Sequence, residues 1–328
     1  MHPLFTRRAA AALLAGVPLA FATTTVAAQS AWPTQTVKLV VPFPPGGGTD
    51  VLARMLADKL RPSLSQPIVI ENRPGATGNI GNDLVAKAAP DGHTVLMQGT
   101  IIGMFPHIFP KLTYDPLKDL VAVGTVAESP NVIVVEASSP LKSLADLVKA
   151  GKADARSLNY GTAGLGSPQH LAIEQLASLA GMKLQHITYR GTSPAVTDLL
   201  AKQTHFGAFS LSSMLPLIQG NKVRVLAVMS DKRTALLPDA PTVSELGYKG
   251  VDSSIRFALF VPAGTPQDVI AKLVAANAKA IADPGLKESF HKAGYETVSA
   301  TPQQTAAMVQ REYDLWGPVV RQLNLKPE

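Results

Sequence analysis

Segments that favour β-strands alternate with segments of helical periodicity along most of this chain, and this alternation constrains the fold more than any single motif. The first strand is predicted at 36–43 and the first helix at 49–60, where apolar residues such as Leu52 and Leu56 share one face. Repeated strand–helix units predict an α/β fold with a parallel sheet. The further strands are expected at 67–71, 94–98, 119–127, 131–136, 157–160, 184–189, 205–209, 223–230 and 253–261, and the further helices at 77–89, 143–150, 167–180, 193–202, 266–282, 284–293 and 302–324.

The order of these elements predicts two α/β domains, the second inserted into the first. Residues 32–129 and 254–328 are expected to form domain 1, and residues 130–253 domain 2. Strands near both junctions would make the crossings. The segment 101–118 is rich in proline and aromatic residues and is predicted to be irregular.

The first residues have the composition of an export signal. Arg7 and Arg8 precede an apolar stretch, and small residues follow up to Ala28, so residues 1–28 are predicted to be a signal peptide cut near Ala28. A periplasmic location follows. A retained membrane anchor and a twin-arginine signal are the alternatives.

Charge and composition exclude several classes of function. Without residues 1–28 the chain has 28 basic and 24 acidic residues, a net charge of +4, and no basic cluster that would indicate nucleic-acid binding. The absence of cysteine excludes thiol catalysis and disulfides. The seven histidines show no metal-ligand spacing, so no metal site is expected.

Four glycine-rich loops, each between a predicted strand and a helix, are the candidate binding elements. They lie at 42–50 (PFPPGGGTD), 71–81, 160–170 and 189–194, two in each predicted domain. Ligands of open α/β sheets bind at the carboxyl ends of strands, where helix N-termini offer free N–H groups. The loops therefore predict a site for an anionic small molecule.

Motifs of common enzymes are not met. The Gly46–Gly48 run lacks the Lys and Ser/Thr of a phosphate-binding P-loop, and no strand–helix turn has the spacing G-x-G-x-x-G. Ser167 and His170 could represent a nucleophile and a base of an exported hydrolase, but Ser167 is better placed as a helix N-cap.

Six stretches resemble one family in order and spacing. They are WPTQTVKLVVPFPPGGGTDVLARMLADKL, VIENRPGATGNIGNDLVAKAAPDGHTVLM, LTYDPLKDL, LNYGTAGLGSPQHLAIEQL, ITYRGTSPAVTDLL and LPDAPTVSELGY followed by VPAGTP. From Trp32 onward, the chain resembles the substrate-binding proteins of tripartite tricarboxylate transporters, the Bug family.

The resemblance implies a type II periplasmic binding protein with a hinge and an interdomain ligand cleft. It implies a monomeric receptor, not an enzyme and without a cofactor, that delivers an organic carboxylate to membrane transporter subunits. A sensor that signals to a two-component system is the alternative. The implied ligand residues are Phe43, Gly46, Gly47, Gly48, Thr49, Asp50, Ala76, Thr77, Gly78, Asn79 and Thr100 in domain 1, and Thr162, Ser167, His170, Arg190, Gly191, Thr192 and Phe209 in domain 2. For Asp50, capping the helix and fixing the loop is the expected main role.

Departures from the family pattern bear on the ligand. His205 and Phe209 stand where many relatives have acidic residues, so an amine-bearing ligand is disfavoured. Arg256 stands where relatives often have tryptophan, and it is expected either to pair with a ligand carboxylate or to bridge the hinge. Phe105 replaces an asparagine, as a cleft wall or a core residue. A dianionic or aromatic carboxylate without an amine is therefore the expected ligand.

Overall fold

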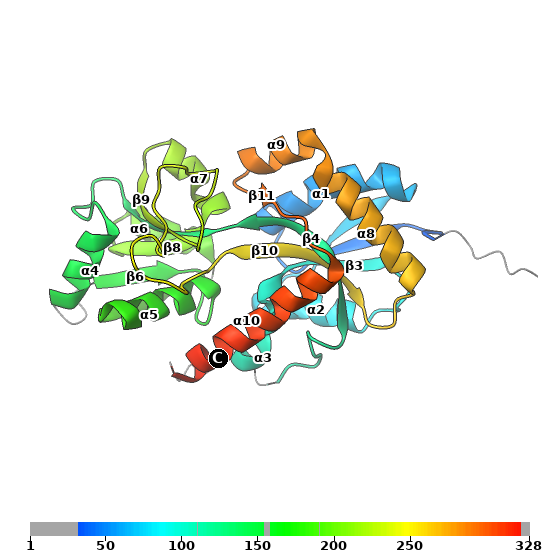
Figure 1. The fold of residues 1–328 in the computed structure, drawn as a ribbon, viewed down its shortest axis with the longest axis horizontal. Coiled ribbons are helices and arrows are strands. Elements are labelled where there is room, and N and C mark those ends of the chain that lie inside the picture. Colours follow the sequence, from blue (N-terminus) through cyan, green and yellow to red (C-terminus); the bar gives the residue numbers. More distant parts are fainter. Residues whose placement is uncertain (1–31, 110, 154–157, 190, 323–328) are drawn as a thin grey trace, which may run out of the picture. The chain divides into compact units, whose positions relative to one another are not determined.

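Two mixed β-sheets organise the part of the chain that the computed structural model describes, which comprises residues 32–109, 111–153, 158–189 and 191–322 (Figure 1). The first sheet has the strand order β11-β4-β10-β3-β1-β2, and the second has the order β7-β6-β8-β5-β9. The predicted signal peptide lies outside the described residues.

The first sheet joins a parallel half to an antiparallel half. Strand β1 pairs in parallel with β2 and β3, whereas β10 runs antiparallel to β3 and β4, and β11 antiparallel to β4. Its strands are β1 (Val37–Val41), β2 (Ile68–Asn72), β3 (Thr94–Gly99), β4 (Leu120–Ser129), β10 (Ile255–Pro262) and β11 (Glu296–Thr297). Its helices are α1 (Gly48–Leu64), η1 (Ala76–Gly78), α2 (Asn79–Ala86), η2 (Thr100–Met104), α3 (Phe105–Ile108), α8 (Gln267–Ala282), α9 (Pro284–Lys292) and α10 (Pro302–Gln322).

The second sheet repeats the same plan on a smaller scale. Strand β6 is parallel to β7 and β8, and β5 is antiparallel to β8 and β9. Its strands are β5 (Asn131–Glu136), β6 (Leu158–Thr162), β7 (Leu184–Thr188), β8 (Phe206–Ser210) and β9 (Val223–Met229), with helices α4 (Leu144–Ala153), α5 (Pro168–Ala180), α6 (Thr192–Leu200) and α7 (Leu211–Gln219).

Strands make the crossing between the two sheets. Strand β4 ends at Ser129, and after Pro130 the chain enters β5 of the second sheet. Strand β10 carries the chain back and pairs with β4 along its length, so the two lie side by side in Figure 1. The exact domain limits stay a prediction.

The amphipathic pattern of the first helix is confirmed. Leu52, Leu56 and Leu60 are buried in a cluster with Leu39 and Val41 of β1. Burial of these apolar side chains is what fixes α1 on the sheet, because an isolated helix of this length would be marginal in water.

Three predictions about the elements are wrong. The first sheet is not wholly parallel, because the chain returns from the second sheet in the opposite direction as β10. Helix α7 was not predicted, since Pro216 within it interrupts the helical signal. The segment after β3 is not irregular throughout, because η2 and α3 occupy its first part.

Other predictions need smaller corrections. A two-residue strand, β11, lies in the region expected to hold only helices. The helix expected at 77–89 is split, because Thr77 has a left-handed backbone conformation (φ 56°), and α2 begins only at Asn79. Phe105 is fully buried, which supports its core alternative.

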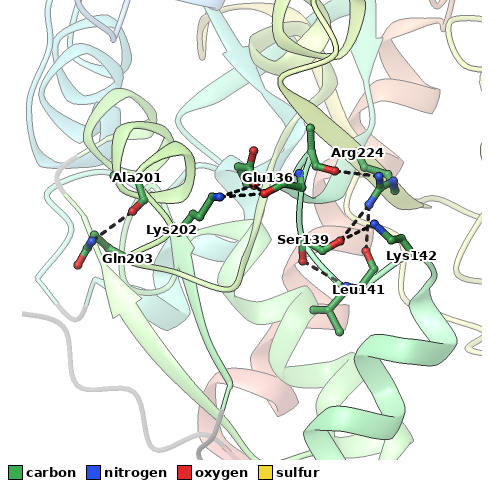
Figure 2. Close-up of polar contacts among 10 residues, drawn as sticks. Glu136, Ser139, Leu141, Lys142, Ala201, Lys202, Gln203 and Arg224 are labelled. Carbon is green, nitrogen blue, oxygen red and sulfur yellow. Dashed lines mark hydrogen bonds and ion pairs between the residues drawn. The ribbon is translucent and has the colours of Figure 1, made fainter.

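Arg224 fastens the loop that follows β5. Its guanidinium donates hydrogen bonds to the carbonyl oxygens of Ala137 (2.8 Å), Ser139 (3.3 Å) and Leu141 (3.4 Å), as Figure 2 shows. Nearby, the ammonium group of Lys202 lies 3.6 Å from the Glu136 carboxylate. One partly buried cation therefore satisfies three backbone acceptors of a single turn.

We expect Arg224→Met to lower the free energy of unfolding by about 2 kcal/mol, because carbonyls that lose a charged donor keep their desolvation cost. Lys202→Met is the matched control, since the Lys202 side chain is 65% exposed and such a surface pair contributes less than about 1 kcal/mol. Urea unfolding of both variants at neutral pH measures the difference, and equal effects would contradict the assignment.

Candidate functional site

The glycine loop leads directly into α1. Gly47 is the N-cap residue, and no described side chain caps the helix, so the prediction that Asp50 caps it is wrong. The first N–H groups of a helix have no intrahelical acceptor. The N–H of Gly46 donates to Asp50 (2.9 Å) and that of Gly47 to the Pro44 carbonyl (3.3 Å). The donors that remain for an anion are therefore those of the first helical turn.

Asp50 fixes this loop, as predicted. Its buried carboxylate also accepts hydrogen bonds from Arg54, at 2.9 Å from both Nε and Nη2, and from Asn72 Nδ2 at 2.9 Å. Asn72 donates in addition to the Phe43 carbonyl at 3.1 Å. Burial would raise the pKa of Asp50, but the hydrogen bonds from Arg54, Gly46 and Asn72 outweigh it and lower the pKa to about 2.

The second loop has an unusual backbone. Gly75, Ala76, Thr77 and Gly78 all have positive φ, of 130°, 47°, 56° and 97°. Left-handed conformations of Ala and Thr are strained, and such strain concentrates at ligand-binding loops. Asn79 accepts a hydrogen bond from the Tyr114 hydroxyl at 2.8 Å, which holds the start of α2.

The first two loops and the end of β3 come together. A Cβ atom placed on Gly78 would lie 2.9 Å from Gln98 Nε2 and 3.5 Å from the Phe43 ring. Thr100, one residue after β3, is fully buried, and its hydroxyl has no hydrogen-bond partner among the described residues. The predicted site residues of domain 1 therefore form one group at the carboxyl ends of β1, β2 and β3.

The loops of the second sheet also meet. The N–H of Gly191, next to Thr192 at the start of α6, donates to the Ala163 carbonyl at 3.0 Å. Ser167 caps α5 as predicted, since its hydroxyl accepts the backbone N–H of His170 at 3.3 Å. Arg190 lies outside the described residues.

Two histidines stack beneath these loops. The rings of His170 and His186 lie 4.0 Å apart at an angle of 17°. His170 Nδ1 accepts the N–H of Gly166 at 3.1 Å, and His186 Nε2 lies 2.8 Å from the Thr162 hydroxyl. Burial, and secondly the neighbouring His186, lowers the pKa of His170 to about 3, and burial lowers the pKa of His186 to about 4. Both rings are therefore neutral at physiological pH.

This pair predicts a pH dependence of stability. Because the folded-state pKa values lie below the unfolded value of about 6.5, the unfolded chain binds more protons in acid. The contribution of the two neutral histidines to the free energy of unfolding is complete above about pH 6.5. It is lost as the pH drops toward 4, by up to about 1.4 kcal/mol per pH unit for each histidine. Urea unfolding of His186→Gln between pH 7.5 and 4.5 should show a shallower slope, whereas His291→Gln, at an exposed position of α9, should not. An unchanged slope in His186→Gln would refute this explanation.

The remaining predicted residues are engaged within the protein. Phe209 is 1% exposed and packs in a core cluster with Val132 and Met214, which favours a packing role. The Arg256 guanidinium lies 2.9 Å from Asp252 and 3.4 Å from Glu128, as the hinge-bridging alternative expects. Ligand contact by either residue stays a prediction.

Two neighbours of the glycine loop were not predicted. The hydroxyl of Tyr295, just before β11, contacts Gly48, and the hydroxyl of Ser212 on α7 lies close by. Neither residue belongs to a glycine-rich loop, and α7 itself gave no clear signal, so the sequence offered no means of finding them.

Among residues 32–322, apart from the gaps given above, no group of three His, Asp or Glu side chains is arranged to hold a metal ion. None of the helices described there is long and apolar enough to cross a membrane.

Residues 52–325 match the family described as tripartite tricarboxylate transporter family receptor. The structure of the periplasmic binding protein BugD is 33% identical and aligns with a TM-score of 0.80 over 90% of this chain and 100% of BugD. An R. palustris protein solved with adipate is 32% identical, with a TM-score of 0.82 over 90% of this chain and 100% of that one. MatC from Rhodopseudomonas palustris, solved with malate, is 31% identical, with a TM-score of 0.78 over 88% and 100%. The predicted fold class is thereby confirmed.

Proposed function

The chain belongs to the tripartite tricarboxylate transporter receptor family, and from this membership we propose that it captures a small organic carboxylate in the periplasm and delivers it to a membrane transporter of that type. The favoured ligands are dicarboxylates or aromatic carboxylates without an amine. Export would remove residues 1–28, and the mature receptor would act as a monomer.

The observation that carries this proposal is the uncapped N-terminus of α1 beside the loop that Asp50 fixes. Its first-turn N–H groups and the positive end of the helix dipole suit one carboxylate. Thr100, whose hydroxyl has no hydrogen-bond partner among the described residues, directly follows β3, the strand that adjoins β1. The second-sheet residues at Thr162–His170 and Gly191–Thr192 would receive the other end of the ligand in a closed form.

Relatives support the ligand class. Adipate and malate, found in two related structures, are dicarboxylates that lack an amine. An amino-acid ligand is therefore disfavoured. His205 and Phe209 do not add to this, because Phe209 is buried in a core cluster and His205 is hydrogen-bonded to Asn159 near the start of β6, at the strand end opposite the site loops.

A binding screen of residues 29–328 tests the proposal. Adipate, malate, benzoate and aspartate would be compared by thermal shift and then by calorimetry. A ligand at 100 times its dissociation constant stabilises by about 2.7 kcal/mol, which raises the melting temperature by several degrees. Tight binding of aspartate with no response to the amine-free acids would overturn the proposed ligand class.

An experiment in cells distinguishes a role in delivery from a role in sensing. A strain that lacks the receptor should lose uptake of the bound acid if the chain serves transport, and should lose only a transcriptional response if it serves sensing. The hydrolase alternative is disfavoured by geometry, because Ser167 accepts a backbone N–H and His170 Nδ1 accepts the Gly166 N–H. Recovery of the ligand chemically unchanged would separate a receptor from a hydrolase.

A further inference from the structure

A chain of hydroxyl groups connects the first sheet to helix α7. The Ser129 hydroxyl, at the end of β4, donates to the Gly294 carbonyl (3.1 Å), accepts the N–H of Ser212 (3.1 Å) and lies 3.0 Å from the Ser210 hydroxyl. The hydroxyls of Ser210 and Ser212 are 2.6 Å apart. Tyr295 directly follows Gly294 in the sequence.

The direction of every bond in this chain follows from its fixed end. A carbonyl only accepts, so Ser129 uses its single proton on Gly294 and must accept from Ser210. Ser210 has then used its proton, so it accepts from Ser212. The chain therefore runs in one direction, from the Ser212 hydroxyl to the Gly294 carbonyl. It ties the residue before Tyr295 to the start of α7.

Two glycines show how closely this chain is packed against the loop. A Cβ atom on Gly48 would overlap the Tyr295 hydroxyl, while the ring carbon that bears this hydroxyl would be 3.8 Å away. Gly48 is a helical residue of α1, so its backbone does not itself demand glycine. A Cβ atom on Gly294 would lie 2.5 Å from Ser212 Cα. The end of the ligand loop, the turn before β11 and the start of α7 thus meet without side chains between them.

We propose that Tyr295 and Ser212 are positioning residues of the carboxylate site, which hold the Gly48 end of the loop and couple it to α7 of the second sheet. The inference rests on the proposed function. The first-turn donors of α1 are set by where Gly48 lies, and Gly48 lies against the Tyr295 hydroxyl. Ser212 and Ser210 belong to the second-sheet part, so movement about the crossing at Ser129 displaces the Tyr295 support.

Affinity for adipate tests this coupling. Tyr295→Phe removes the hydroxyl that lies against Gly48, and Ser212→Ala removes the first donor of the chain that holds Gly294, so each should weaken adipate binding about tenfold. Because both act on the position of Tyr295 against Gly48, the double variant should be no weaker than either single variant. The controls are Tyr248→Phe, a partly buried tyrosine outside the site, and Ser213→Ala, the exposed neighbour on α7. Both controls should bind as the unaltered protein does.

A second double-mutant cycle tests the contact between Gly48 and the Tyr295 hydroxyl. Gly48→Ala should weaken adipate binding and lower the melting temperature, because the added methyl group overlaps the Tyr295 hydroxyl. In a Tyr295→Phe background the same methyl group meets a ring carbon and the Ser212 hydroxyl, both at an ordinary contact distance of 3.8 Å, so Gly48→Ala should cost much less. A purely structural role of Tyr295 elsewhere would give no such relief.

The outcomes separate this inference from the proposed function. Unchanged affinity in Tyr295→Phe and Ser212→Ala, additive losses in the double variant, or no relief of Gly48→Ala would each overturn the positioning role. Failure of the unaltered protein to bind any carboxylate would overturn the proposed function instead. The melting temperatures of the Gly48 cycle would then still decide whether Tyr295 positions the loop.

Discussion

Asp50→Asn is expected to destabilise the protein by about 2–3 kcal/mol at pH 7, because the buried carboxylate accepts hydrogen bonds from one backbone and two side-chain partners. An amide of the same shape carries no charge for Arg54, and it turns an NH₂ group toward donors. Asp58→Asn on the same helix is the matched control: its partner Arg61 lies 3.0 Å away, but the Asp58 side chain is 66% exposed. That variant should change stability by less than about 0.5 kcal/mol.

The pH dependence gives this prediction a second measurement. The folded-state pKa of Asp50 is about 2 and lies below its ordinary value of 3.8. The contribution of the carboxylate is therefore complete above pH 3.8 and is lost as the pH falls toward 2. Urea unfolding at pH 7 and pH 3 should show the gap between Asp50→Asn and the unaltered protein narrowing in acid. A gap that stays constant would mean that the charge of Asp50 is not the cause.

Ligand binding should also depend on Asp50. Asp50 holds the Gly46 N–H and, through Asn72, the Phe43 carbonyl, so its loss releases both ends of the glycine loop. We expect Asp50→Asn to weaken adipate binding by at least about tenfold, although Asp50 itself offers an anion no donor. Calorimetry with adipate measures this effect, and Asp58→Asn should bind as the unaltered protein does.

Local signals in the sequence were sufficient for most of the strands and helices and for the loops. The run of apolar residues before Gly46–Gly48 and the helical spacing after it predicted β1, the loop and α1, because each depends on residues close in sequence. The N-cap at Ser167 was predicted for the same reason. The order of the six motifs predicted the family, which periodicity alone does not indicate.

The predictions that failed concern features that depend on contacts between residues far apart in the sequence. Asn72 reaches Asp50 across 22 positions, and Ser212 reaches Ser129 across 83. No local sequence pattern indicates such partners. The antiparallel entry of β10 depends on how the chain returns from the second sheet, and α7 was hidden by Pro216. Of the two neighbours of the glycine loop that were not predicted, Ser212 lies on α7 and Tyr295 lies just before β11, a strand that was not predicted either.

Arg256→Met is expected to cost about 3 kcal/mol at pH 7, since removing one partner leaves partly buried carboxylates uncompensated. In register, Glu296, Glu128 and Arg256 lie side by side on β11, β4 and β10. Asp252 lies 2.9 Å from the guanidinium. Burial raises the pKa of Glu128, which Arg256 opposes, and burial likewise raises the pKa of Glu312. Arg256 therefore compensates several carboxylates at the strand crossing.

The stability deficit of this variant should also shrink as the pH falls, but at a higher pH than that of Asp50→Asn, in the range where Glu128 titrates. A carboxyl group whose folded-state pKa is raised destabilises the fold while it is charged, and this cost disappears as the pH falls through that pKa. Without Arg256 the pKa of Glu128 should rise further. The stability deficit of Arg256→Met should consequently shrink between pH 7 and pH 5, as measured by urea unfolding.

The double variant Arg256→Met with Glu128→Gln distinguishes the two roles predicted for this arginine. If Arg256 bridges the hinge, neutralising Glu128 should recover part of the lost stability, and adipate affinity should recover with it. If the guanidinium instead binds the ligand carboxylate, stability should recover while affinity stays low, because the donor is still missing. The ion pairs with Asp252 and Glu128 favour the first result, since an arginine already shared between two carboxylates of its own chain has little attraction left for a third.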